Sequence, residues 1–187
     1  MRKTIVAINI TLDGFCDHTA VIADEELHEF FANVMEKVGT SVMGRITYQL
    51  MEDYWPEVAK NKSGTGAEVK FAEAIDKVEK IVVSRTLTSV NWENTTILSE
   101  NIVEKIKQLK LEEGGNIDIG GPSLISLLAQ ENLIDEFIFV IHPFILGKGI
   151  ALMRDLPKRL DLELIDERRF KSGAIVTHYK KRHNSYE

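Results

Sequence analysis

This 187-residue chain contains the stretch Ile117-Asp118-Ile119-Gly120-Gly121-Pro122-Ser123-Leu124, which predicts a strand, a tight turn and a helix in immediate succession. The apolar residues at its start are typical of a short buried strand. The two glycines let the backbone turn sharply and approach a ligand closely. Pro122 suits the first turn of a helix, where its missing N–H costs nothing. The apolar face of this helix comes from Leu124, Ile125, Leu127 and Leu128.

Strands and helices alternate on both sides of this stretch. Further strands are predicted at Ile5–Ile10, Ser41–Met43, Lys80–Ser84, around Ile97, at Glu136–His142, and in a C-terminal antiparallel pair, Leu160–Arg169 and Ala174–Lys180, joined around Lys171-Ser172-Gly173. Further helices are predicted after Asp24, from about Arg45, and over Ile102–Leu109. This order predicts an α/β fold with a mixed central sheet, mostly parallel but with antiparallel C-terminal strands, and helices on both faces.

The helix after Asp24 has the clearest pattern. Asp24 is a typical N-cap, and one apolar stripe at helical spacing is formed by Leu27, Phe30, Phe31, Val34, Met35 and Val38. By contrast, Asn61-Lys62-Ser63-Gly64-Thr65-Gly66 predicts a mobile surface loop. No repeat or low-complexity linker divides the chain, so residues 1–187 are predicted to form a single domain.

Composition narrows the possible partners. The chain is 44% hydrophobic and 28% charged, with a net charge of −6, which disfavours nucleic acid or an anionic membrane as the main partner. No apolar run approaches the roughly 20 residues that span a bilayer, and the N-terminal residues predict a strand rather than a signal peptide. The single cysteine, Cys16, excludes an intramolecular disulfide and a cysteine-based zinc cluster, and the histidines have no metal-ligand spacing. A cytoplasmic protein without a metal is therefore expected.

Three turns suited to phosphate each follow a predicted strand. They are Met43-Gly44-Arg45-Ile46-Thr47, Val83-Ser84-Arg85-Thr86 and Ile119-Gly120-Gly121-Pro122-Ser123. They combine glycines, hydroxyl groups, guanidinium groups and helix starts, all of which bind phosphate. Each turn alone is more often an ordinary turn. Together they predict one nucleotide lying across the carboxyl ends of the strands.

Several sequence motifs of this chain match those of a known protein family. In chain order they are Ile8–Phe15, which ends in Leu12-Asp13-Gly14-Phe15, then Val42–Tyr48, Gly120–Leu124, Leu133–Glu136, His142–Gly149 and Phe170–Gly173. With these motifs the sequence resembles the riboflavin-biosynthesis reductase (RibD C-terminal) domain family, part of the dihydrofolate reductase-like superfamily. The resemblance covers nearly the whole chain and implies the same mixed α/β fold.

The resemblance also implies hydride transfer from NADPH to a pterin-like or related small molecule. Residues matching the family's cofactor contacts are Gly44, Arg45 and Thr47 for the phosphates, Ser84 and Arg85 for the 2′-phosphate, Ile119, Gly120, Gly121, Pro122, Ser123 and Leu124 for the pyrophosphate and nicotinamide, and Ala7, Gly14 and Phe15 beside the nicotinamide. It further implies a cis peptide between Gly120 and Gly121. A homodimer involving the region of Gly147-Lys148-Gly149 is likewise implied.

The substrate side follows the superfamily less closely. The position of a folate reductase's pterin-binding carboxylate falls on His28, and its partner threonine falls near Val140, which argues against dihydrofolate as substrate. His28 and Asp13 are the candidate proton donors, together with Glu26 and Glu29 beside His28. The alternative interpretations are a boundary histidine, a turn-forming aspartate and two solvated glutamates on the helix surface. Three functions remain open: a reductase of the riboflavin type, a dihydrofolate reductase, or a non-catalytic NADPH-binding module.

Overall fold

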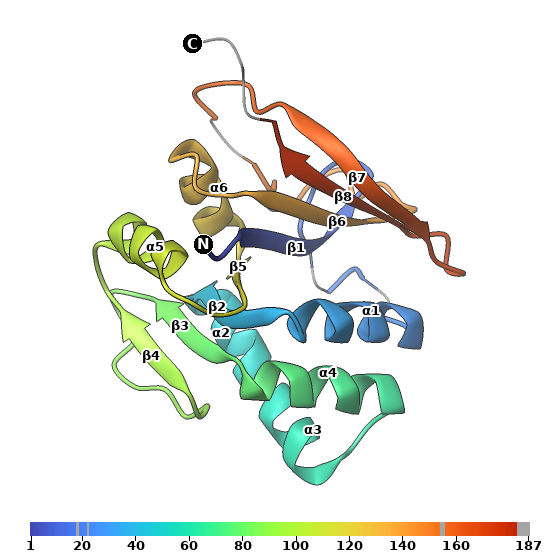
Figure 1. The fold of residues 1–187 in the computed structure, drawn as a ribbon. Helices are drawn as coiled ribbons and strands as arrows, with labels where there is room; N and C mark the ends of the chain where they lie inside the picture. Colours follow the sequence, from blue (N-terminus) through green and yellow to red (C-terminus); the bar gives the residue numbers. More distant parts are fainter. Residues whose placement is uncertain (18, 22, 154–155, 183–187) are drawn as a thin grey trace.

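The computed structural model describes residues 1–17, 19–21, 23–153 and 156–182. In this part of the chain one eight-stranded sheet runs in the order β4-β3-β2-β5-β1-β6-β8-β7 (Figure 1). Its strands are β1 (Thr4–Thr11), β2 (Val38–Gly44), β3 (Glu79–Val83), β4 (Thr95–Leu98), β5 (Asn116–Gly120), β6 (Glu136–His142), β7 (Leu162–Arg169) and β8 (Ile175–Lys181). The helices are α1 (Glu25–Met35), α2 (Arg45–Glu52), α3 (Trp55–Asn61), α4 (Gly66–Lys77), α5 (Ile102–Leu111) and α6 (Pro122–Gln130).

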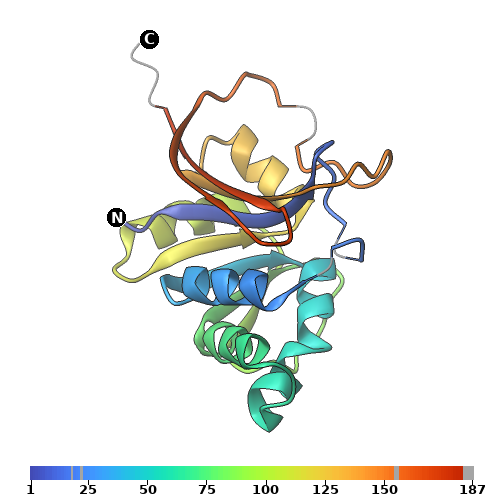
Figure 2. The same ribbon diagram turned by 90° about the vertical axis from the view of Figure 1, so that its right-hand side faces the viewer.

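The strand pairing makes the sheet mixed. β1 to β6 are joined by parallel pairings, and β8 pairs antiparallel with both β6 and β7. Figure 2 shows the β7–β8 hairpin at the opposite end of the molecule from α3. The predicted mixed sheet with an antiparallel C-terminal pair is confirmed. None of the helices in the described part of the chain combines the length and the apolarity that a membrane crossing requires.

Alternation along the strands builds a core on each face of the sheet. On β1, Ile5 packs with α1 and α4, whereas Val6 packs with α5 and α6. The same alternation places Met43 on the α1 face and Val42 on the α6 face, because successive side chains of a strand point to opposite sides. Helices therefore cover both faces, as predicted.

One local prediction is wrong. Val38 begins β2 instead of extending α1, because the chain must pass close to Gly115: a Cβ on Gly39 would lie 3.0 Å from Gly115 N. The surface loop predicted at Asn61–Gly66 is the exposed connection between α3 and α4. In it Thr65 caps α4 through a reciprocal pair of hydrogen bonds with Glu68.

Candidate functional site

The three predicted phosphate-binding turns meet at one edge of the sheet. β2 lies between β3 and β5, with Gly44 beside Val83 and Met43 beside Gly120 in the strand register. Because these strands are parallel, the turns at their carboxyl ends lie next to one another. The structure therefore brings together three segments that are far apart in the sequence.

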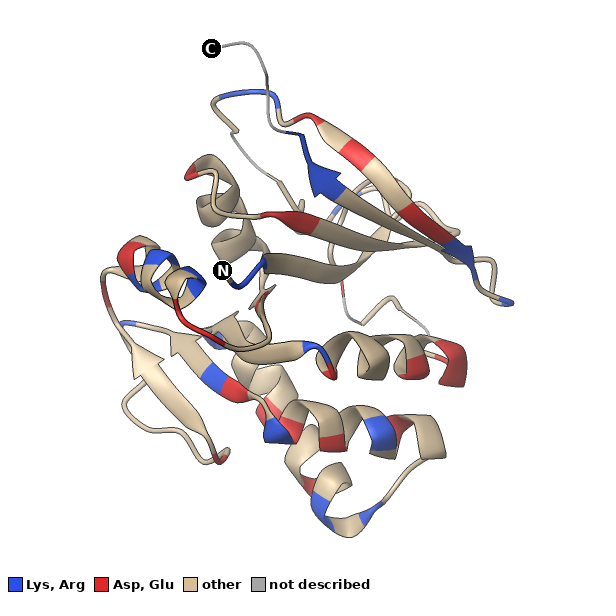
Figure 3. Ribbon diagram, in the orientation of Figure 1, with Lys and Arg blue, Asp and Glu red and all other residues tan. Residues whose placement is uncertain are grey.

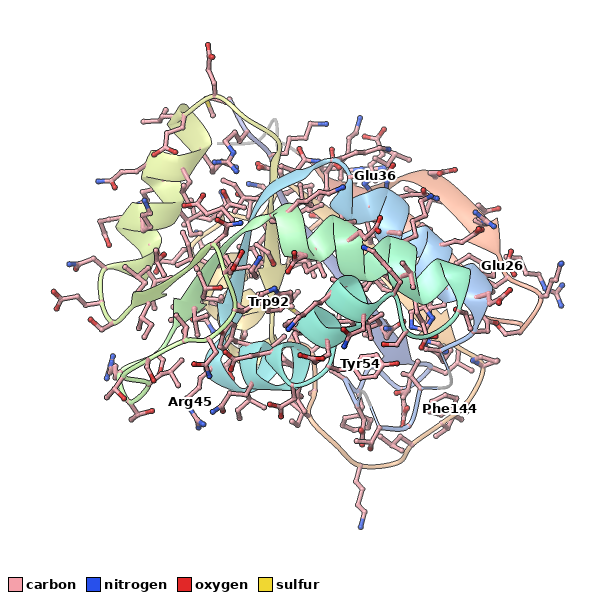
Figure 4. The ribbon with its side chains drawn as sticks, turned by 90° about the horizontal axis from the view of Figure 1, so that it is seen from below. Glu26, Glu36, Arg45, Tyr54, Trp92 and Phe144 are labelled. Carbon is pink, nitrogen blue, oxygen red and sulfur yellow. The ribbon has the colours of Figure 1, made fainter. Side chains whose placement is uncertain are left out.

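Figure 4 shows this edge from below the molecule. Arg45, which follows β2, and Phe144, which follows β6, both lie toward the lower side of the view, with Tyr54 between them. Glu36, which precedes β2, lies on the opposite side. The lower side is thus the carboxyl edge of the sheet, and it is shared by the β2 and β6 ends.

The two glycines after β5 allow their turn to approach α2. Gly121 has a φ of +103°, a conformation that favours glycine, and a Cβ built there would lie 2.9 Å from Thr47 Oγ1. A Cβ on Gly120 would lie 3.1 Å from Met43 Cγ. The expected cis peptide between Gly120 and Gly121 is wrong: every peptide bond of the described residues is trans, and the positive φ of Gly121 turns the chain instead.

Helices α2 and α6 begin at this edge without a side-chain cap. Gly44 precedes α2 and Gly121 precedes α6, and neither gives the helix a side-chain hydrogen bond. The first N–H groups of a helix have no partner inside it and attract anions. A Cβ on Gly44 would find no heavy atom within 4 Å, so the backbone there is open to a ligand.

Arg45 and Arg85 are both exposed at this edge. Arg45 Nη1 donates to Gln49 Oε1 at 2.9 Å, whereas the guanidinium of Arg85 donates no hydrogen bond to any residue that the structure describes. Ser84 is buried, and its hydroxyl accepts a hydrogen bond from Leu87 N at 2.9 Å. Both guanidinium groups can therefore turn toward an anion, while Ser84 stabilises the turn that carries Arg85.

The other predicted cofactor residues after β5 divide into core and surface. Ile119 and Leu124 are buried in the core on the α6 face. Ser123 is exposed in the first turn of α6, and Pro122 is the first helical residue, as predicted. The side chains of Ile119 and Leu124 therefore cannot contact a ligand at this edge, although their backbone atoms can.

Asp13 ties the loop after β1 to the loop after β6. Its carboxylate accepts hydrogen bonds from Thr11 Oγ1 at 2.6 Å, from Leu146 N at 3.1 Å and from Gly147 N at 2.8 Å. The Thr11 hydroxyl is the main cause that lowers the pKa of Asp13 to about 2, and the two backbone N–H groups act in the same direction. Near neutral pH this carboxylate has no proton to give, and its contacts are those of a structural turn.

The neighbouring predicted residues Gly14 and Phe15 extend this connection. Gly14 has a φ of +80°, and its carbonyl accepts from Leu152 N at 3.2 Å. Phe15 forms an antiparallel bridge with Ala151. The loop predicted to flank the nicotinamide is thus held against the β6–β7 connection.

His28 lies on α1 and faces α3. Its ring meets the ring of Trp55 edge-on, with 5.7 Å between centroids. Burial lowers the pKa of His28, while the carboxylates of Glu68 and Asp24 act in the opposite direction. No hydrogen bond or ion pair joins His28 to Asp13, so the two predicted proton donors do not form one unit.

The two carboxylates beside His28 differ in their contacts. Glu26 accepts from Arg168 Nη2 at 2.9 Å and from Lys171 N at 2.8 Å, and Glu29 is exposed. Figure 3 shows the acidic first turn of α1. These contacts direct Glu26 toward the β7–β8 hairpin.

Asp118 is a buried acid that the sequence interpretation missed, and it lies where β1 and β5 separate. The pairing of these two strands stops at Ile5 and Asp118, although β1 stays paired with β6 up to Thr11. The Asp118 carboxylate accepts from Ser41 Oγ at 3.0 Å and from the backbone N–H of Ala7. Burial raises its pKa to about 6, against these hydrogen bonds. Ala7 therefore sits at a fork in the sheet.

A second missed pair lies further along β1. His142, which the sequence marked only as a strand end, is 6% exposed, and its Nε2 lies 3.0 Å from Asn9 Oδ1. The sequence alone could not have identified this polar pair, because its two residues become neighbours only through the pairing of β1 with β6.

Two cavities open away from this edge. One of about 350 Å³ is lined by α1, β2 and α4 and includes Glu36 and Lys77. The other, of about 510 Å³, includes Lys158 and Arg159.

Comparison with known proteins identifies the family. The profile of the RibD C-terminal domain matches residues 2–176. The chain is 30% identical to YyaP, an uncharacterized protein of Bacillus subtilis, over 184 residues that cover 95% of this chain and 94% of YyaP. It is 29% identical to YwjB of the same organism, over 95% of this chain and 97% of YwjB.

Solved structures show the same fold. A protein of Shewanella sp. PV-4 assigned provisionally to riboflavin biosynthesis has a TM-score of 0.74 at 23% identity, covering 97% of this chain and 99% of that one. A bifunctional deaminase and 5-amino-6-(5-phosphoribosylamino)uracil reductase of Thermotoga maritima has a TM-score of 0.68 at 15% identity, covering 97% of this chain and 57% of that one. The chain belongs to the RibD C-terminal domain family.

Proposed function

We propose that this protein is an NADPH-dependent reductase of a small carbonyl or imine substrate, and that its cofactor lies across the carboxyl ends of β1, β2, β3 and β5. The observation that carries this proposal is the packing of the Gly120–Gly121 turn against Thr47. This turn lies between two helix starts that have no side-chain cap, and Gly121 leaves room there only for the Thr47 hydroxyl. Phosphates bind such N-termini through backbone N–H groups.

The residues at this edge fit a phosphorylated dinucleotide. The backbone at Gly44 and Gly121, with Thr47, would hold the pyrophosphate. Arg85, exposed after β3, would meet the 2′-phosphate that distinguishes NADPH from NADH. Ala7, at the fork between β1 and β5, would flank the nicotinamide.

When bound, a reduced nicotinamide supplies a hydride. The chain's own residues then have to orient the substrate, exclude water and provide a proton. Asp13 is ionised and hydrogen-bonded to its loop partners, so His28 is the stronger candidate for the proton. Because burial lowers its pKa, protonated His28 would be a stronger acid than a free imidazolium and would act as a proton donor mainly below pH 6.5.

Titration with NADPH and NADH tests the cofactor assignment. Arg85→Ala should weaken NADPH binding by about tenfold or more, the effect of one lost Arg–phosphate contact, and should leave NADH binding nearly unchanged. Arg45→Ala should act in the same direction. Arg159→Ala, at an exposed arginine paired with Asp161, is the matched control. Equal losses for both nucleotides in Arg85→Ala would remove the 2′-phosphate assignment, and no NADPH binding by the wild-type protein would remove the proposed function.

A further inference from the structure

Asn9 and His142 lie on neighbouring parallel strands at the carboxyl edge. In the register of β1 and β6, Asn9 is beside Val140 and Thr11 is beside His142. Ile5 and Ala7 on β1, and Val140 on β6, pack in the core that α1 covers. Because side chains alternate along a strand, Asn9 and His142 also face the α1 side of the sheet.

The pair is held in one arrangement. His142 Nε2 lies 3.0 Å from Asn9 Oδ1, and the His142 ring packs near that of Phe144, with 6.0 Å between centroids. Burial lowers the pKa of His142, against the effect of Asp24, so the ring is neutral near pH 7. Since the acceptor is Asn9 Oδ1, the proton of the neutral ring lies on Nε2.

The amide nitrogen of Asn9 remains available. Asn9 is partly exposed, and its Nδ2 donates no hydrogen bond to any residue that the structure describes. A carboxamide has two N–H donors on this atom. The carboxylate of Asp24, which acts electrostatically on His142, accepts through Oδ1 from Leu27 N at 2.8 Å as the cap of α1. The amide of Asn9 itself offers uncharged donors.

We propose that Asn9, oriented by His142, donates a hydrogen bond to a ring carbonyl of an uncharged heterocyclic substrate. This deepens the proposed function and rests on it, because Ala7, on the same face of β1 and about 7 Å away along the strand, is the residue expected beside the nicotinamide. A ring of pteridine or pyrimidine size next to the nicotinamide reaches Asn9. A carboxylate at this place would select a protonated amino-substituted ring, whereas the Asn9 amide selects a carbonyl.

The test compares lumazine, a pteridine with two ring carbonyls, with 2,4-diaminopteridine, in which amino groups replace them. Both are titrated calorimetrically into the protein with and without saturating NADP⁺, which cannot transfer a hydride. The wild-type protein should prefer lumazine, and Asn9→Asp should weaken lumazine by about tenfold and strengthen 2,4-diaminopteridine by a similar factor. His142→Phe, which keeps a ring but loses the donor to Asn9, should weaken lumazine severalfold.

Asn33→Asp is the matched control, because it makes the same charge change on the exposed side of α1 beside Lys70. If Asn9→Asp does not fold, Asn9→Ser removes the amide donors without adding charge and should also lose the preference for lumazine. Equal lumazine affinity in wild type and Asn9 variants, or no lumazine binding to the wild type, overturns the inference. Loss of NADP⁺ binding alone counts against the proposed function, and the titrations without nucleotide still decide the role of Asn9.

Discussion

The two halves of the carboxyl edge differ in whether their polar groups have hydrogen-bond partners within the protein. At the ends of β2, β3 and β5, the helix starts after Gly44 and Gly121 lack side-chain caps, and Arg85 makes no ion pair with a described residue. At the ends of β1 and β6, Asp13, Asn9 and His142 are hydrogen-bonded to protein groups. The first half is arranged to take up an anion. The second is pre-organised by its own contacts, so its specificity depends on fixed geometry.

The largest expected effect is at Asp118, where the two halves separate. Its folded pKa of about 6 lies above the ordinary 3.8, so the folded state binds this proton more tightly than the unfolded state. The resulting stability is complete below pH 3.8 and is lost as the pH rises through 6. Asp118→Asn removes this dependence. Denaturant unfolding should show the variant gaining about 3 kcal/mol relative to wild type between pH 3 and 7.

If the unfolding free energies of the wild type and Asp118→Asn change in parallel over this pH range, Asp118 has the same pKa in the folded and the unfolded chain. The Asn variant can still accept from Ala7 N or Ser41, so a constant offset between the curves does not affect the comparison of slopes.

The next largest effect is expected on turnover, if His28 on α1 donates the proton. Once a substrate is known, His28→Gln should lower turnover by about 10²-fold while NADPH affinity stays unchanged. In the wild-type protein, turnover should fall as the pH rises through a value below 6.5, because burial lowers the pKa of His28. His178→Gln, on β8 and bonded to Glu136, is the control. Unchanged turnover in His28→Gln would favour protonation by water.

A smaller effect separates folding from binding at the glycine turns. Gly121→Ala should destabilise the protein by about 2 kcal/mol, because of its positive φ and the contact with Thr47. Gly44→Ala has space for its methyl group and should cost less than about 0.5 kcal/mol, yet it should weaken NADPH binding. Unfolding curves and nucleotide titrations on both variants check this. Full NADPH affinity in Gly44→Ala would show that the ligand does not approach this backbone.

The smallest effect on catalysis is expected at Asp13. Asp13→Asn should speed hydrogen exchange at the backbone amides of Leu146 and Gly147, because both lose a charged acceptor. Turnover should change far less than in His28→Gln. If Asp13→Asn lost turnover while hydrogen exchange at these amides stayed unchanged, Asp13 would have a direct role in catalysis.

The sequence predicts local features well and contacts between distant segments poorly. The succession of strands and helices along the chain, the cap at Asp24 and the three turns follow from short-range patterns. Helix α4 was also within reach, since Thr65 and Glu68 form a capping box. Asp118 and His142 were not, because each acquires its meaning from a strand that lies more than 70 residues away along the chain. The trans turn at Gly121 depends likewise on the approach of Thr47.

The central position of β1 has a consequence for biosynthesis. Arg2 bonds to Gly115 across 113 residues of sequence, and Thr4 N bonds to Asp135 across 131. At about 5–20 residues per second on the ribosome, β1 waits roughly 6 to 25 seconds for both of its partner strands. During that interval its apolar residues and its backbone hydrogen-bonding groups have no sheet to join. The segment that carries Ala7 and Asn9 is therefore synthesised well before it can join the sheet. We expect β1 of the nascent chain to need protection from aggregation until β6 has emerged.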